Sequence, residues 1–310
     1  MANLRNVKVV LYEPDRDLRS VLLGKLRELE FEDILDTPTV DSVEQAFLDG
    51  EVDLAILGTT RENDVMCRLL RDIRQGERGD NPFPVAIATC DAASEKHMRS
   101  VIDAGFDNAL IKPFDAASIA RRVRHFCQSR NPFVVTHDYI GPDRRSEKRR
   151  VGADPKLIDA PNPVRILADG HSRDFLGRQI SAARGVVDEE KLQKDAASIQ
   201  WLVDRLCASA IISDTNAVEQ CGLLAAQIHR QAENMLNRST RTEYAHVADM
   251  CMTVAEIAMR IATAGRIPDT KDVELLENLN KAIFRAMSSD ETDAGVIRDI
   301  RASALMATEN

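Results

Sequence analysis

The chain has 310 residues, of which 44% are hydrophobic and 29% are charged, and its formal net charge is -9. This length is enough for about two domains, and the composition is typical of a folded globular protein. Aromatic residues make up only 4% of the chain, which disfavours a β-sandwich and the stacking of nucleic-acid bases. The acidic balance also disfavours binding of nucleic acid or an anionic membrane by the chain as a whole.

Neither a membrane span nor a secretory signal is predicted. No run of about 18 apolar residues is present, and the first residues lack an apolar core with a cleavage site. The six cysteines are scattered singly without a CxxC pair, which is typical of apolar fillers in a reducing compartment. We therefore expect a cytoplasmic protein with no membrane insertion, no metal and no other cofactor.

The first part of the chain, residues 1–128, alternates short apolar runs with amphipathic stretches. The apolar runs predict strands at 7–12, 33–36, 53–57, 84–88 and 108–111. Apolar residues at steps of three and four predict helices at 15–29, 41–49, 62–75, 92–104 and 115–128. This alternation indicates an α/β fold with a doubly wound, parallel, five-stranded sheet. Functional groups of such a sheet lie at the carboxyl ends of its strands.

The rest of the chain changes character twice. Residues 129–163 contain five of the eleven prolines and a basic cluster, and we expect an extended linker there. Residues 164–310 form the third region, where helical spacing continues from about 170 to 308 with breaks near 213–216, 237–240 and 265–269. Long helices with short connections predict a separate all-α bundle of four or five helices.

Two motifs at the ends of predicted strands carry a family resemblance. The fourth strand ends in Ala88-Thr89-Cys90, and the fifth ends in Ile111-Lys112-Pro113-Phe114. With the five alternating strands and helices, residues 1–128 resemble the receiver (CheY-like) domain of response regulators, which is a flavodoxin-like fold. The resemblance implies acids after the first strand that hold magnesium, and an aspartate after the third that accepts a phosphoryl group. It also implies that Lys112 pairs with the phosphate and that the Thr89 hydroxyl reads its presence.

Three parts of that receiver site are missing from this sequence. Glu13 stands at the first acidic position after the first strand, but Pro14 takes the second. Gly58 stands where the family has its phosphoacceptor, and glycine has no side chain to phosphorylate. The aromatic switch position, three residues before the lysine, is Ala109. The sequence thus predicts a pseudo-receiver that keeps the fold without aspartyl phosphorylation.

Two interpretations of the retained Thr89 and Lys112 stay open. In the structural one, Lys112 caps carbonyl groups at the strand ends or pairs with Glu13. In the functional one, Lys112, Thr89 and the Gly58 backbone form a small anion pocket, although Glu13 would neutralise the lysine locally.

The basic cluster of the linker is a candidate ligand-binding site. Arg145 and Arg149 have an RxxxR spacing, with Arg144 and Arg150 beside them. Arginine forks bind phosphate and stack on guanine, and the stretch is similar in composition to arginine-rich tails that bind cyclic di-GMP. The alternative is a solvated tether that lies against acidic parts of its own chain. Nucleic acid is not expected, given the net charge and the scarcity of aromatic residues.

The helical region offers only weak candidates for catalysis. His229 and His246 lack the His-x-x-Lys-Gly pattern of phosphotransfer domains. Glu277 and Asn280 have the spacing of the acid and amide pair of a receiver phosphatase, but nothing beyond this spacing supports that role. We therefore expect no enzyme, and phosphotransfer or phosphatase activity is the second alternative.

The leading hypothesis is a bacterial signalling adaptor that acts by protein–protein interaction without phosphorylation. The pseudo-receiver would bind signalling proteins, and the helical region would serve as an output or oligomerisation module. A cyclic di-GMP effector that uses the arginine cluster is the first alternative. The oligomeric state stays open, with a homodimer among the options.

Overall fold

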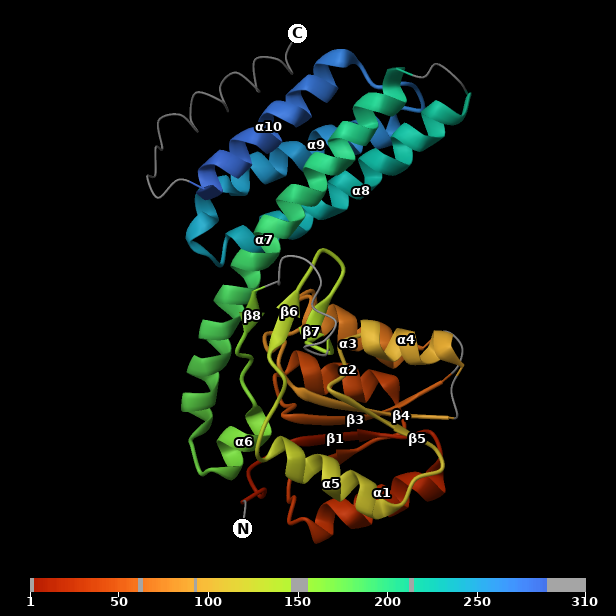
Figure 1. Cartoon of the computed structure of the whole chain (residues 1–310), viewed down its shortest axis with the longest axis vertical. Coiled ribbons are helices and arrows are strands. Elements are labelled where there is room, and N and C mark those ends of the chain that lie inside the picture. Colours follow the sequence, from red (N-terminus) through yellow and green to blue (C-terminus); the bar gives the residue numbers. More distant parts are fainter. Residues whose placement is uncertain (1–2, 61–63, 92–93, 146–155, 212–214, 289–310) are drawn as a thin grey trace. The chain divides into compact units, whose positions relative to one another are not determined.

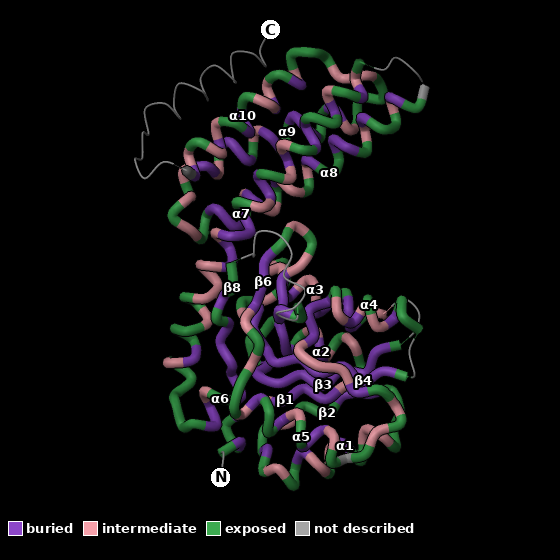
Figure 2. Tube along the Cα trace, in the orientation of Figure 1, coloured by how far each residue is buried: buried purple, intermediate pink, exposed green. Residues whose placement is uncertain are grey.

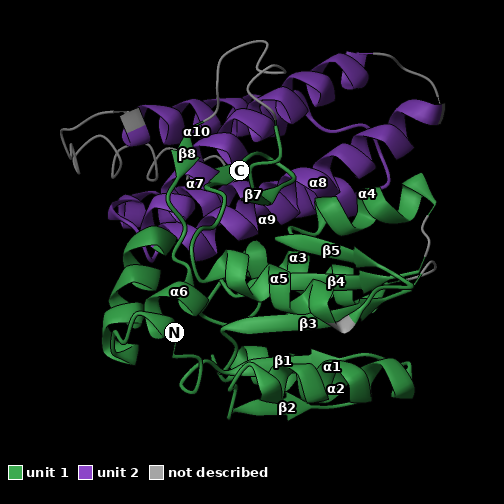
Figure 3. Cartoon of the chain, turned by 60° about the horizontal axis from the view of Figure 1, so that its bottom comes forward, with its two compact units in different colours: residues 1–184 green, residues 185–310 purple. Residues whose placement is uncertain are grey.

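The computed structural model of the chain describes residues 3–60, 64–91, 94–145, 156–211 and 215–288. It divides into two compact units, residues 1–184 and residues 185–310 (Figure 3). We call them the receiver-like unit and the helical unit. Each has a hydrophobic core of its own.

The receiver-like unit is built on a five-stranded sheet in the order β2-β1-β3-β4-β5 (Figure 1). All its pairings are parallel, and the order is that of flavodoxin-like folds. The two central strands β3 and β4 are buried throughout (Figure 2), which is why their sequences read as unbroken apolar runs. The predicted α/β fold is confirmed. The strands are β1 (Val9–Tyr12), β2 (Ile34–Asp36), β3 (Leu54–Thr59), β4 (Val85–Cys90) and β5 (Asn108–Ile111).

Five helices cover the two faces of this sheet (Figure 1). α1 and α5 pack on one face, and α2, α3 and α4 pack on the other. Four of them begin at a side-chain cap: Asp15, Asp64, Ser94 and Asp115 each accept backbone N–H groups of the first turn. The helices are α1 (Arg16–Glu28), α2 (Val40–Leu48), α3 (Val65–Arg74), α4 (Glu95–Asp103) and α5 (Ala116–Phe126).

The structure corrects the extended linker expected at 129–163. Its described residues form a small antiparallel sheet in the order β7-β6-β8, with β6 (Phe133–Val135), β7 (Ile140–Pro142) and β8 (Leu157–Ile158). Phe133 is fully buried, and the neighbouring apolar residues of β6 and β7 are buried with it. Proline is tolerated here because β7 is an edge strand. These apolar residues, and not the prolines, decide the structure of the segment.

A buried ionic cluster attaches this segment to the parallel sheet. Asp107, at the amino end of β5, accepts hydrogen bonds from Arg74 (Nη2 to Oδ2, 3.0 Å) and Arg130 (Nε to Oδ1, 2.7 Å). Both guanidinium groups also lie against the Phe133 ring, 5.1 and 4.6 Å from its centroid. Burial lowers the pKa of Arg74 to about 10, although the charge of Asp107 opposes this. We call Arg74, Asp107 and Arg130 the arginine–aspartate cluster.

The boundary between the units also differs from the one expected at residue 164. The short helix α6 (Pro163–Ala168) and the first turns of α7 (Arg173–Ile211) belong to the receiver-like unit. Leu167 and Leu176 enter the core under α1 and α5, and Arg173 pairs with Asp53 at 2.9 Å. The helical periodicity was continuous here, but it gave no sign of which core the residues join.

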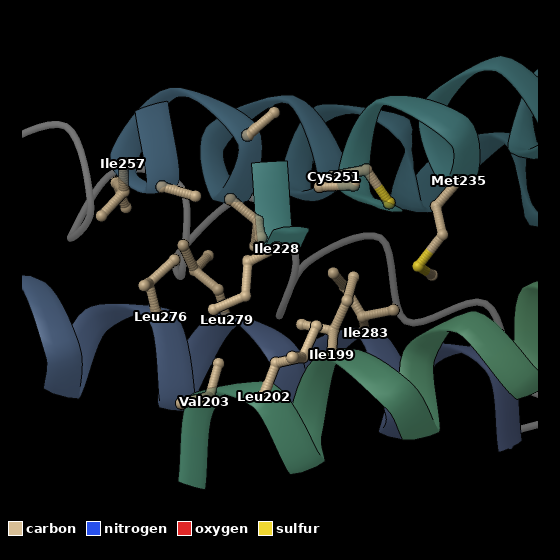
Figure 4. Close-up of a cluster of buried hydrophobic side chains, with 14 of the residues drawn as sticks. Ile199, Leu202, Val203, Ile228, Met235, Cys251, Ile257, Leu276, Leu279 and Ile283 are labelled. Carbon is tan, nitrogen blue, oxygen red and sulfur yellow. The ribbon is translucent and has the colours of Figure 1, made fainter. Parts of the chain in front are cut away.

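The helical unit is an all-α bundle, as predicted. Apolar side chains from all its long helices meet in one core (Figure 4), and the breaks predicted near residues 239 and 267 separate consecutive helices. In the described part of the chain, no helix is long and apolar enough to cross a membrane. Its elements are the later turns of α7, then α8 (Thr215–Ser239), the 3-10 helix η2 (Glu243–Val247), α9 (Ala248–Thr263) and α10 (Thr270–Ser288).

Candidate receiver-like site

The centre of the candidate site is the carboxylate of Glu13, just beyond the carboxyl end of β1. Glu13 is fully buried. Its Oε1 accepts a hydrogen bond from Lys112 Nζ at 2.8 Å, and its Oε2 accepts one from the Thr89 hydroxyl at 2.5 Å. Both predicted residues that the family resemblance retains are thus bound to one acidic side chain. Lys112 is half-buried, and its positive charge balances the buried negative charge of Glu13.

The loop after β1 holds this carboxylate in place. The backbone N–H of Asp15 donates to Glu13 Oε1 at 3.1 Å, and Arg19 donates to the Glu13 carbonyl at 3.1 Å. The Asp15 side chain turns away to cap α1, where it accepts from the N–H groups of Asp17 and Leu18. Asp15 therefore does not replace the second acid that is missing at Pro14.

Gly58 is required by the geometry of the same loop. A Cβ atom at this position would lie 2.6 Å from Pro14 Cδ, 3.2 Å from Glu13 Oε2 and 3.3 Å from Glu13 Cα. A separation of 2.6 Å is far inside van der Waals contact, so a side chain at residue 58 would have to displace the proline ring. The two departures from the receiver pattern, Pro14 and Gly58, are therefore coupled in space.

Ala109 lies on β5 opposite Ala88 of β4 and is half-buried. On β3, beyond β4, Thr59 donates from its hydroxyl to the Thr89 carbonyl at 3.3 Å and lies 3.2 Å from His97 Nε2. Thr59 and His97 are both buried. The sequence did not single them out, because a threonine ending an apolar strand and a histidine in an amphipathic helix carry no distinctive spacing.

Asp64 is a second acid at this end of the sheet. Burial raises its pKa, although the backbone N–H groups of Cys67, Thr60 and Met66 all donate to its carboxylate and act in the opposite direction. Burial also raises the pKa of Tyr12, helped by the negative charges of Asp64 and Glu13. Asp64 works as the cap of α3, a role that an aspartate before an amphipathic helix can suggest from sequence.

The arrangement leaves little room for phosphoryl or magnesium chemistry. Both oxygens of Glu13 are engaged, and the space beside Gly58 is filled by Pro14 and Glu13. Within the described residues, no group of three or more His, Cys, Asp or Glu side chains is arranged to hold a metal ion. The anion pocket considered from the sequence contains an anion already, the Glu13 carboxylate.

The described arginines of the basic cluster contact their own chain. Arg145 forms a two-pronged pair with Asp143, with Nε to Oδ1 at 2.8 Å and Nη2 to Oδ2 at 3.1 Å. Arg144 donates to the Phe106 carbonyl. Both border a pocket of about 270 Å³ between α4 and the β6–β7 hairpin. The other predicted members, Arg149 and Arg150, lie outside the described residues.

In the helical unit, the predicted candidates have structural contacts. Asn280 is fully buried, and its amide donates to Gln200 Oε1 at 3.0 Å, so Glu277 and Asn280 do not present a pair at the surface. His229 Nδ1 lies 2.9 Å from the Ala255 carbonyl and its Nε2 lies 3.4 Å from Glu233. The ring nitrogens of His246 lie 3.3 and 3.4 Å from two backbone carbonyls.

The similarity found to known proteins is one of structure and covers part of the chain. No protein-family model matches the chain, and no curated protein matches it. Among solved structures, that of an orphan response regulator of H. pylori covers 39% of this chain and 96% of its own, with 15% identity and a TM-score of 0.33. The receiver-like fold rests instead on the strand order and on the helix layers of the unit itself.

Proposed function

We propose that this chain is a bacterial signalling adaptor whose receiver-like unit binds partner proteins without being phosphorylated. One observation carries the proposal: the buried Glu13 carboxylate binds the Thr89 hydroxyl and the Lys112 ammonium at the same time. In a working receiver these two groups respond to a phosphoryl group. Here a negative charge of the chain itself occupies them permanently.

The proposal assigns the two units different tasks. The receiver-like unit presents a fixed surface, because the groups that would change partners on phosphorylation are already bound. The helical unit serves as the output or oligomerisation module. The contacts of Arg145 with Asp143 support an adaptor over the cyclic di-GMP effector, because the arginine fork that would hold a phosphate is engaged.

The test is chemical phosphorylation of the full chain. Acetyl phosphate with Mg²⁺ should add no phosphoryl group that is labile to hydroxylamine, as measured by intact mass, while a phosphorylatable response regulator in the same reaction gains one. Fluorine NMR with beryllofluoride and Mg²⁺ should show no bound signal. Aspartyl phosphorylation of the wild-type chain would refute the proposal.

Two variants distinguish the absence of an acceptor carboxylate at residue 58 from the obstruction of the site by the Pro14 ring. Gly58→Asp alone should still fail to bind beryllofluoride, because the Pro14 ring lies where the new side chain must start. Pro14→Asp combined with Gly58→Asp removes the ring and supplies two carboxylates, so beryllofluoride should now bind. Binding by the single variant would show that Pro14 does not close the site.

A further inference from the structure

A shallow groove runs between α8 and α9 on the outside of the helical unit. Its volume is about 450 Å³, and its floor is largely apolar. Met252 and Met259 line it and are 40% and 43% exposed, whereas Met235 and Met250 in the core of the same unit are buried. Methionine side chains adapt to varied partner surfaces, and an apolar groove between two helices is suited to bind a third helix.

The rim of this α8–α9 groove carries unbalanced negative charge. Glu233 and Glu256 are exposed along it. The one arginine of the rim, Arg260, is paired with Asp272 at 2.6 Å. Glu233 faces only His229 Nε2, at 3.4 Å, and Glu256 has no ion-pair partner among the residues that the structure describes. The groove is therefore complementary to an apolar segment that carries positive charge.

The chain contains such a segment directly after α10. Residues 289–310 lie outside the described residues, and their sequence is acidic at first and then reads Val296-Ile297-Arg298-Asp299-Ile300-Arg301 before an alanine-rich stretch to Ala307. Val296, Ile297 and Ile300 recur at helical spacing. Arg298 and Arg301, less Asp299, give residues 296–307 a net charge of +1. The segment therefore complements the apolar floor and the acidic rim of the groove.

The position of the segment along the chain also fits. α10 ends near the start of α9, where the groove begins, because the Ala286 carbonyl lies 3.4 Å from His246 Nε2 and η2 leads into α9 just before Met252. The groove follows α9 from Met252 to Thr263, about 16 Å of helix at 1.5 Å per residue. A helix made of residues 296–307 would be about 18 Å long.

We propose that residues 296–307 bind in the α8–α9 groove of their own chain. Their apolar positions would cover Met252 and Met259, and Arg298 and Arg301 would lie beside Glu233 and Glu256. The short connection from α10 gives the segment a high effective concentration at the groove. A partner that uses this surface must then displace the segment. The inference does not depend on the function proposed for the receiver-like unit.

The experiment follows the methionine methyl groups of the full chain by NMR. With nine methionines, each methyl signal can be assigned by a Met→Leu substitution. Ile297→Asp combined with Ile300→Asp should move the Met252 and Met259 signals and leave Met235 in place. The matched control, Ala302→Asp with Asn310→Asp, adds the same charge on the opposite helix face and beyond the segment, and should move none of them. A peptide of residues 289–310, added to the released variant, should restore the original positions.

Each other outcome would overturn the proposal. If Met252 and Met259 do not respond to the isoleucine changes, the segment does not cover them. If the control moves them equally, the response is one of charge and not of binding. If their positions change with protein concentration, the occupant is a second copy of the chain. The thermal unfolding of each variant, followed by the fluorescence of Trp201, the single tryptophan, checks that the bundle is intact.

Discussion

The two ends of the parallel sheet both carry buried ionic groups, and they use them differently. At the carboxyl end, the single carboxylate of Glu13 is balanced by the single ammonium of Lys112. At the amino end, the carboxylate of Asp107 is shared by the guanidinium groups of Arg74 and Arg130. The first group occupies the place of a receiver site, and the second attaches an extra sheet to the fold.

The difference shows how a receiver-like fold can be closed at one end and extended at the other. Glu13, with Lys112 and Thr89, ties together the carboxyl ends of β1, β4 and β5, so this end of the sheet is held by side chains of the chain itself. The arginine–aspartate cluster instead joins the sheet to residues 130–161, because Arg130 also donates to the carbonyls of Phe83, Pro84 and Pro161. We expect the amino end to matter more for stability and the carboxyl end more for specificity.

The largest expected effect is that of Asp107→Asn. This change leaves two buried guanidinium groups without a counter-charge, and breaking a buried pair in this way costs about 3–5 kcal/mol of unfolding free energy. Urea denaturation, with hydrogen exchange in peptides from β3 and β4, measures it. The control is Asp138→Asn, whose side chain is 90% exposed and whose loss should be nearly neutral. Equal effects of the two changes on the free energy of unfolding would show that the arginine–aspartate cluster does not stabilise the fold.

The second effect is steric and belongs to the carboxyl end. Gly58→Ala forces a Cβ against Pro14 and should cost about 1–3 kcal/mol of unfolding free energy, as overpacking does. Adding Pro14→Ala should recover much of that loss, since the ring is the nearest obstacle. Gly24→Ala in α1 is the matched control, because no atom lies within 4 Å of its Cβ position and alanine favours a helix interior. A double variant as unstable as Gly58→Ala would contradict this.

The sequence predicted these two ends unequally. Strand and helix periodicity places Glu13, Thr89 and Lys112 at the carboxyl end of the sheet, and a Glu13–Lys112 pair is one of the interpretations that the sequence allows. Predicting the coupling of Pro14 with Gly58 would require the distance between a loop and a strand residue 44 positions later in the chain. The three-dimensional structure is needed to see that the two residues are in contact.

The amino end escaped prediction for other reasons. Arg74 and Arg130 looked like ordinary surface cations at a helix end and in a loop, and Asp107 stood alone between a glycine turn and a strand. The strands β6, β7 and β8 have three residues or fewer, which is too short for a period of two to stand out among prolines. Tertiary burial, not local pattern, determines them.

The third effect tests the pair at the carboxyl end directly. A double-mutant cycle of Glu13→Gln and Lys112→Met should give a coupling of about 1 kcal/mol in unfolding free energy, within the range for residues in contact. It should be smaller than the effect of Asp107→Asn, because Lys112 is 20% exposed and water can replace part of the lost interaction. The same urea experiment measures it. A coupling near zero would mean that the pair positions the loop without stabilising it.

The smallest expected effect is a pH dependence of stability that arises from Asp64 at the carboxyl end of the sheet. Burial raises the pKa of Asp64 above its ordinary value of 3.8, so the folded state holds this proton more tightly than the unfolded state. The contribution of Asp64 to stability is therefore greatest below pH 3.8 and decreases as the pH rises through its folded pKa. Asp64→Asn keeps an oxygen to cap α3 and cannot ionise, so the variant should gain stability relative to wild type as the pH rises from about 3 to 6. Urea midpoints across this range measure the gain. A flat difference between Asp64→Asn and wild type would show that the backbone donors of Thr60, Met66 and Cys67 offset the burial of this carboxylate.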